Sequence, residues 1–131
     1  MADFGFAPQL TASGTIAPNR FVKISGAYQG AQCAAITDFP IGVTDQSTRA
    51  FDNTTDHALS GDLISLQPSR MVQVTAGAAV AAASRVGSDT TGRAIVAVTS
   101  SPIYGTAITA AAAAGEIIWV YYAPTATFAT A

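Results

Sequence analysis

The chain has 131 residues, of which 50% are hydrophobic and only 11% are charged, with a formal net charge of −2. This length predicts one folded domain, and the charged fraction is far below the roughly 25% of an average soluble domain. The few basic residues form no cluster, which argues against nucleic-acid binding, and no apolar run reaches the roughly 20 residues that a membrane helix needs.

The single cysteine and the first residues of the chain bear on the compartment in which the protein is made. Cys33 is the only cysteine, so an intrachain disulfide is excluded, and we expect it to be a small buried hydrophobic residue. The first residues have neither the basic nor the apolar region of a secretory signal. We therefore expect synthesis in a cytoplasm.

Residues 1–14 show no helical or strand periodicity, and we expect an extended N-terminal arm outside the core. Burying its apolar side chains would contribute about 1.5–3 kcal/mol each, whereas ordering the arm costs about 1–2 kcal/mol per residue. We therefore expect it to be mobile in the free protein and to bind by pairing its backbone with a partner strand. The candidate anchors are Phe4, Phe6, Pro8 and Leu10. A frayed terminus without a role is the alternative.

A single β-rich domain is expected over residues 15–131. Alternating apolar and polar residues predict a strand at 21–25, followed by a turn between two glycines at 26–30. Further short strands are expected at 33–37 and 41–44.

Residues 45–60 are polar and aperiodic, which predicts a long surface loop. The segments 63–67 and 71–75 are expected to pair as a hairpin across the turn at 67–70. Residues 94–99 read as another strand.

Two alanine-rich segments are ambiguous. Residues 76–83 could form one helical turn, and residues 103–114 could form a helix or a packed loop. Since no longer helix is expected, the predicted class is mainly β: a small β-barrel or β-sandwich, β-tulip-like, with short helical turns.

Residues 116–122 are the clearest strand, and they are apolar on both faces. Such a strand needs cover from the domain core on one side and from something else on the other. In so small a protein the second cover could be another subunit, so the candidate subunit-interface residues are Trp119, Tyr121 and Tyr122. The alternative is that all three serve the core of one subunit.

No residue pattern indicates a reactive centre. His57 is the only histidine, and with Asp52 and Asp56 it matches neither a zinc nor a calcium spacing. The remaining carboxylates stand singly, and Asp62 and Asp89 are expected in turns. We therefore expect no enzyme, catalytic residue, metal, cofactor or small-molecule substrate.

Three stretches in a fixed order carry a resemblance: residues 40–44, 75–94 and 103–120. Over about 15–122 the chain resembles the capsid decoration, or cement, proteins of tailed bacteriophages. The resemblance implies a structural virion protein, made in the host cytoplasm, that binds the major capsid protein on the outer capsid surface as a homotrimer. It would stabilise the shell against internal pressure.

Two rival functions remain at this point. A β-sandwich adhesion or glycan-binding module of a phage tail or fibre would need exposed aromatic residues in loops, and Tyr28 is the candidate. A small enzyme would have to depend on His57.

Overall fold

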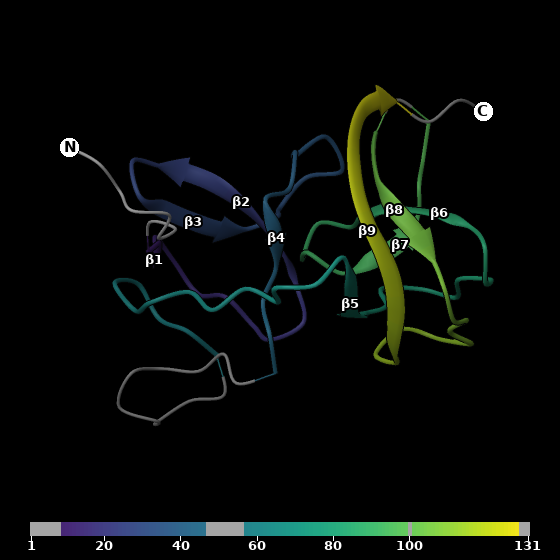
Figure 1. Cartoon of the computed structure of the whole chain (residues 1–131), viewed down its shortest axis with the longest axis horizontal. Helices are drawn as coiled ribbons and strands as arrows, with labels where there is room; N and C mark the ends of the chain where they lie inside the picture. The colour runs from purple at the N-terminus through teal and green to yellow at the C-terminus, as the bar shows by residue number, and fades with distance from the viewer. Residues whose placement is uncertain (1–8, 47–56, 100, 129–131) are drawn as a thin grey trace.

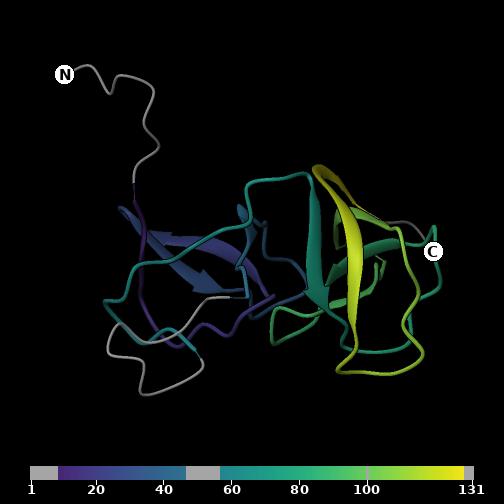
Figure 2. The ribbon, with the colours of Figure 1, turned by 60° about the horizontal axis from the view of Figure 1, so that its bottom comes forward.

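The computed structural model describes residues 9–46, 57–99 and 101–128. In these ranges the chain forms nine strands and no helix. The strands make two sheets that lie side by side along the long axis of the molecule (Figures 1 and 2). Neither sheet closes on itself, so the mainly-β prediction is confirmed in its open, two-sheet form, while the barrel and the short helical turns are not found in the described ranges.

The first sheet has short strands in the order β1-β3-β2-β4. Strands β2 and β3 form an antiparallel hairpin, β1 joins β3 in parallel, and β4 pairs with β2. Their bounds are Thr11–Ala12 (β1), Phe21–Gly26 (β2), Gln29–Gln32 (β3) and Gly42–Val43 (β4).

The second sheet is antiparallel throughout, in the order β5-β9-β8-β6-β7. Strand β9 is its longest, with 12 residues, and lies between β5 and β8. At Gly105 the backbones of β8 and β9 approach so closely that a Cβ would collide with the carbonyl oxygen of Tyr121. The bounds are Met71–Thr75 (β5), Arg85–Ser88 (β6), Ala94–Val96 (β7), Pro102–Ala107 (β8) and Ile117–Phe128 (β9).

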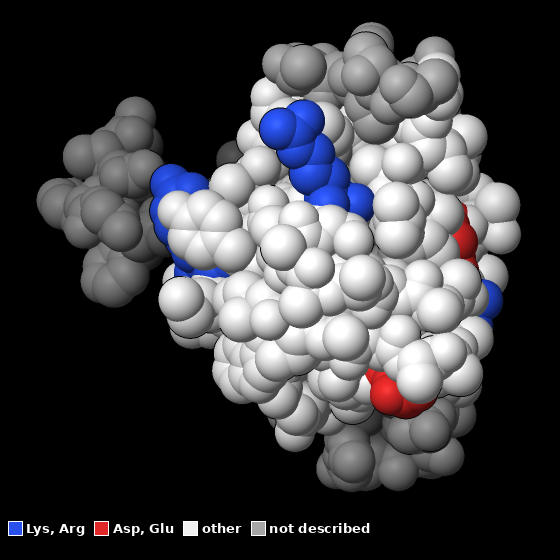
Figure 3. All heavy atoms as spheres, turned by 90° about the vertical axis from the view of Figure 1, so that its right-hand side faces the viewer, with Lys and Arg blue, Asp and Glu red and all other residues white. Residues whose placement is uncertain are grey.

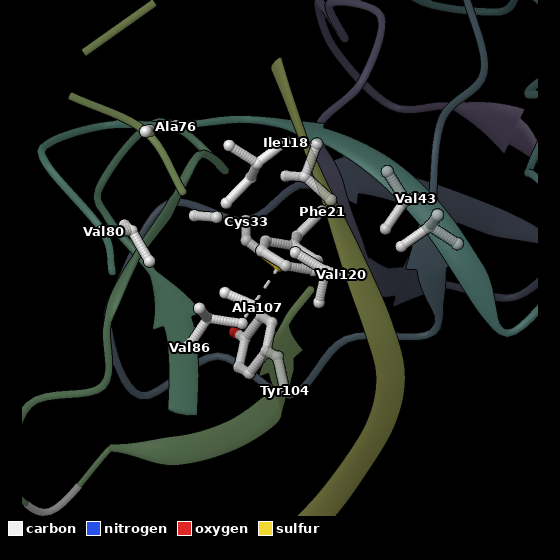
Figure 4. Close-up of a cluster of buried hydrophobic side chains, with 14 residues drawn as sticks. Phe21, Cys33, Val43, Ala76, Val80, Val86, Tyr104, Ala107, Ile118 and Val120 are labelled. Carbon is white, nitrogen blue, oxygen red and sulfur yellow. Dashed lines mark hydrogen bonds between the residues drawn. The ribbon is translucent and has the colours of Figure 1, made fainter. Parts of the chain in front are cut away.

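One apolar cluster joins the two sheets, as Figure 4 shows. Phe21 and Cys33 from the first-sheet region meet Tyr104 and Val120 of the second, and all four are buried. The rings of Phe21 and Tyr104 pack edge to face with centroids 4.7 Å apart, a favoured aromatic geometry. Cys33 is fully buried, as expected from the sequence.

Side-chain amides connect the facing edges of the two sheets. The Gln67 side chain donates to the carbonyl oxygens of Thr44 (3.0 Å) and Gln73 (2.8 Å), and accepts from the Gln73 amide (2.8 Å). Asn19 donates to the same Gln73 carbonyl at 3.0 Å. These bonds satisfy backbone groups at the edge of β5 that a neighbouring strand would otherwise satisfy, so the sheets are joined but remain separate.

The prediction that residues 63–67 and 71–75 pair as a hairpin is wrong. Strand β5 pairs with β9 instead, while Leu63 and Leu66 form isolated bridges with Thr11 and Thr44. The Gln67 side chain bonds to the backbone amide and carbonyl of Gln73, which a hairpin partner strand would otherwise have bonded.

The prediction of a strand at 33–37 is also wrong, because β3 ends at Gln32. The Asp38 carboxylate accepts hydrogen bonds from the amides of Ala34 (2.8 Å) and Ala35 (3.0 Å), which folds this segment into a turn.

Neither alanine-rich segment is helical: residues 76–83 form a loop, and residues 103–114 comprise most of β8 followed by a loop. The amide and carbonyl of Val80 exchange hydrogen bonds with those of Ala111 at 3.0 and 2.8 Å. Because these backbone groups pair across the two loops, they are not available for helical hydrogen bonds.

Candidate functional site

The outer face of β9 presents a row of exposed apolar side chains. Ile117 is 51% exposed, and Trp119 and Tyr121 are each 43% exposed. The alternate residues Ile118 and Val120 point into the core and are buried. Side chains along a strand point alternately to opposite faces, so among the described residues the core covers only one face of this two-sided strand.

Neighbouring strands extend the row. Met71 on β5 lies opposite Tyr121 and is 54% exposed, and Ile108 donates its amide to the Trp119 carbonyl at 2.8 Å and is 42% exposed. Residues directly opposite one another in antiparallel strands share a face. We call the resulting surface the β9 face: Met71, Ile108, Ile117, Trp119 and Tyr121.

The β9 face is uncharged. Its remaining register partners on β5 and β8 are Gln73, Thr75 and Thr106, and Glu116 is the only charged residue anywhere after Arg93. One strand further out, the exposed Arg85 on β6 lies opposite Thr106, so a positive charge borders the face. Figure 3 shows the end of the molecule formed by the second sheet, where charged side chains are few and scattered. An uncharged apolar surface of this kind suits contact with another protein.

Tyr122 does not join the β9 face. Its ring packs 6.5 Å from the ring of Phe21, and its hydroxyl is buried without a hydrogen-bond partner. Burial raises the pKa of this hydroxyl, and the nearby Cys33 raises it further. The structure thus brings Trp119 and Tyr121 together on the outside and places Tyr122 against the core.

A second apolar surface lies on the first sheet. Ile24 and Phe39, which are 53% and 51% exposed, line an open hollow of about 670 Å³. A salt bridge of 3.0 Å between Lys23 and Asp38 lies in the same hollow. We call it the 24–39 hollow, and it is lined by Lys23, Ile24, Ser25, Thr37, Asp38, Phe39 and Ile41.

The Asp38 carboxylate holds this hollow in shape. Burial would raise its pKa, but hydrogen bonds from the Ala34 amide, Lys23 and the Ala35 amide outweigh burial and hold the pKa below its usual value. The Asp38 backbone carbonyl also accepts a hydrogen bond from the Tyr104 hydroxyl. The hollow is therefore tied directly to the core between the sheets.

The predicted arm falls only partly within the described residues. Phe4, Phe6 and Pro8 lie outside them. Leu10 is half-buried and its carbonyl accepts a hydrogen bond from the Ile64 amide at 2.9 Å, and Ala12 is buried in a small cluster of the first sheet. The described fold therefore begins before residue 15.

The carboxylates at the described positions make local structural contacts. Each of them accepts a hydrogen bond from a neighbouring group. Asp62 and Asp89 accept from backbone amides within turns, as expected. The other three are Asp38, Asp45 and Glu116. No group of three or more potential metal ligands occurs within 9–46, 57–99 and 101–128.

Cys33 and His57 lie in different surroundings. Burial raises the pKa of the Cys33 thiol to about 12, which keeps it protonated at neutral pH. His57 is half-buried and lines a surface hollow with Arg20. The described chain has no helix long and apolar enough to cross a membrane.

Sequence reasoning missed Met71, Ile108 and Ile117 of the β9 face, and Ile24 and Phe39 of the hollow. The strand alternation of β5 could have indicated Met71, since Val72 and Val74 are apolar and alternate with it. Whether the other missed residues form a shared surface depends on which segments become neighbours in the fold, and no local pattern shows that.

Comparisons with known proteins agree with this fold. The chain is similar to a solved structure described as the head fiber gp8.5 N base in bacteriophage phi29, with a TM-score of 0.66 and 18% identity over 88% of this chain and 91% of that one. The fold therefore places the chain in a class of two-sheet, all-β proteins that includes a phage head protein. No curated protein matches the chain.

The family is identified by sequence. The family model for phage cement proteins matches residues 5–122, and the chain belongs to that family. It is a structural protein of the virion, as the sequence resemblance predicted.

Proposed function

We propose that the chain binds the outer surface of a phage capsid as a homotrimer, contacts the major capsid protein, and stabilises the shell against internal pressure. The observation that carries the proposal is the β9 face: five large apolar side chains exposed together on one sheet, with no charge among them. Family membership supports the capsid as the partner.

The energetics favour a multivalent mode of binding. Burying a large apolar side chain contributes about 1.5–3 kcal/mol, so a few exposed residues support only a modest contact once the costs of association are subtracted. A trimer that bridges several capsid subunits makes each later contact intramolecular, and weak contacts then add to a firm attachment. This activity needs neither a cofactor nor a small-molecule substrate.

The N-terminal residues are proposed as a capsid contact. Phe4, Phe6 and Pro8 precede Leu10, whose carbonyl accepts a hydrogen bond from the Ile64 amide. Deletion of residues 2–8 should leave a folded protein with reduced capsid binding. Deletion of 2–13 would instead remove the backbone partners of Ile64 and Gln29.

Co-sedimentation tests the proposal. Purified chain is mixed with decoration-free heads of the parent phage, and we expect saturable binding together with greater survival of DNA-filled heads on heating. A protein that does not sediment with either unexpanded or expanded heads would contradict capsid binding. Binding without any gain in survival would contradict the stabilising role.

The adhesion alternative has one structural observation in its favour. Tyr28 is 68% exposed in the turn between β2 and β3. Specific binding on a glycan array, abolished by Tyr28→Asn, would support that function.

A further inference from the structure

We propose that in the trimer the β9 face of one copy docks into the 24–39 hollow of the next copy. This inference rests on the trimer of the proposed function and names the two surfaces that meet. It makes the contact heterologous, since the two copies contribute different surfaces.

Symmetry is the first argument. An isologous contact joins a surface to its own copy and ends at a dimer, whereas a three-fold ring requires each copy to present two different, complementary surfaces. Two apolar surfaces of the described chain meet this requirement: the β9 face on the second sheet and the 24–39 hollow on the first. The chain thus carries both halves of a ring contact.

Shape is the second argument. The β9 face presents the bulky side chains of Trp119 and Tyr121, both 43% exposed. The other surface is a hollow of about 670 Å³ with Ile24 and Phe39 on its walls. Aromatic anchors inserted in apolar pockets are the contacts that carry most of the binding energy in protein interfaces.

Charge is the third argument, and it favours a second copy as the occupant. The five side chains of the β9 face carry no charge and the exposed Arg85 lies at their border. The two charges of the hollow, Lys23 and Asp38, already neutralise each other at 3.0 Å. Copies of a chain with net charge −2 can therefore meet here without like-charge repulsion. The partly exposed Lys23 ammonium can also lie against an aromatic ring. The association should depend little on salt concentration.

The experiment uses one variant for each surface. Trp119→Ser removes the anchor but keeps the hollow, and Phe39→Ser alters the hollow but keeps the β9 face. We expect wild type to sediment as a trimer and each variant to associate about 30-fold or more weakly. Val96→Ser is the matched control, because Val96 is 46% exposed on β7 at the far edge of the second sheet. It should remain trimeric. Val96→Ser should unfold at the wild-type temperature, and the two interface variants within a few degrees of it, because they lose only the stabilisation from association.

Mixing the variants tests the pairing directly. Isotope-labelled Phe39→Ser is titrated with unlabelled Trp119→Ser, and NMR follows the backbone amides of Ile117, Trp119 and Tyr121. The intact β9 face of Phe39→Ser should bind the intact hollow of Trp119→Ser, so the resonances of these amides should shift and saturate at a 1:1 ratio. Neither variant titrated with itself should produce the shift. Absence of the shift in the mixture, or a trimer that persists in either variant, overturns the inference.

Co-sedimentation with heads separates this inference from the proposed function. A Phe39→Ser protein that stays trimeric but no longer binds heads would assign the hollow to the capsid and overturn the pairing alone. A wild-type protein that binds heads but is monomeric at every concentration would also overturn the pairing and leave capsid binding standing.

Discussion

The inner and outer faces of β9 differ in exposure but hardly in composition. Ile118 and Val120 on the inner face are buried in the core that joins the two sheets, whereas Ile117 and Trp119 on the outer face are about half exposed. Both faces are apolar, so composition alone does not determine which side chains stabilise the fold. The packing of the first sheet against the second makes the inner face part of the core and leaves the outer face exposed.

The largest effect should come from truncating the inner face. Ile118→Ala should lower the free energy of unfolding by about 2–5 kcal/mol, because it leaves a cavity in the core. The adjacent Ile117→Ala, at a position that is 51% exposed, should change it by less than about 0.5 kcal/mol. Chemical denaturation of both variants measures the difference. Equal losses of unfolding free energy in the two variants would show that both faces of β9 contribute equally to stability.

The next effect concerns the bond that ties the 24–39 hollow to the core. Tyr104→Phe should lower the free energy of unfolding by about 1–3 kcal/mol, because the Asp38 carbonyl loses its donor in a buried site. Chemical denaturation monitored by Trp119 fluorescence measures it. Unchanged stability would mean that the hollow is held by other contacts.

Acid should weaken the turns that Asp38 and Asp89 organise. The pKa of each carboxyl is lowered in the folded state, since hydrogen bonds outweigh the opposing effect of burial. Their contribution to stability is therefore present above the ordinary pKa of 3.8 and is lost as pH falls through the lower folded-state pKa values. Thermal unfolding from pH 7 to pH 2 should show this loss. Asp38→Asn and Asp89→Asn should each be less stable at neutral pH and less sensitive to acid; a wild-type pH profile in both would contradict the assignment.

The smallest effect is expected at Tyr122. Its buried hydroxyl has no partner, so Tyr122→Phe removes an unsatisfied group and should leave stability unchanged or raise it by up to about 1 kcal/mol. It should not alter self-association, because the ring faces the core. Loss of the trimer in this variant would place Tyr122 at the subunit contact after all.

The sequence was most informative where alternation was clear. Phe21–Gly26 and Met71–Thr75 show it, and both were predicted as strands; the start of β9 was predicted instead from its continuous apolar run. The sequence could not show that β5 pairs with β9, or that the Gln67 side chain caps the other edge of β5. Long-range contacts of this kind leave no local pattern.

The same limit applies to the candidate surfaces. The two-sided apolar pattern of residues 116–122 predicted a strand, which is confirmed, and Trp119 and Tyr121 lie on its exposed face. Their place at a subunit interface stays a prediction. Tyr122 was grouped with them although alternation along the strand puts it on the other face. The 24–39 hollow could not be anticipated, since it forms only where the Asp38 turn folds back beside β2.

The most direct test of the account is the solution mass of Trp119→Ser/Tyr121→Ser, measured together with its unfolding temperature. If the outer face of β9 serves association and not folding, the double variant will unfold within a few degrees of wild type and sediment as a single chain, while wild type sediments as a trimer. A double variant that keeps the trimeric mass, or one that loses its fold, would contradict the division between the two faces.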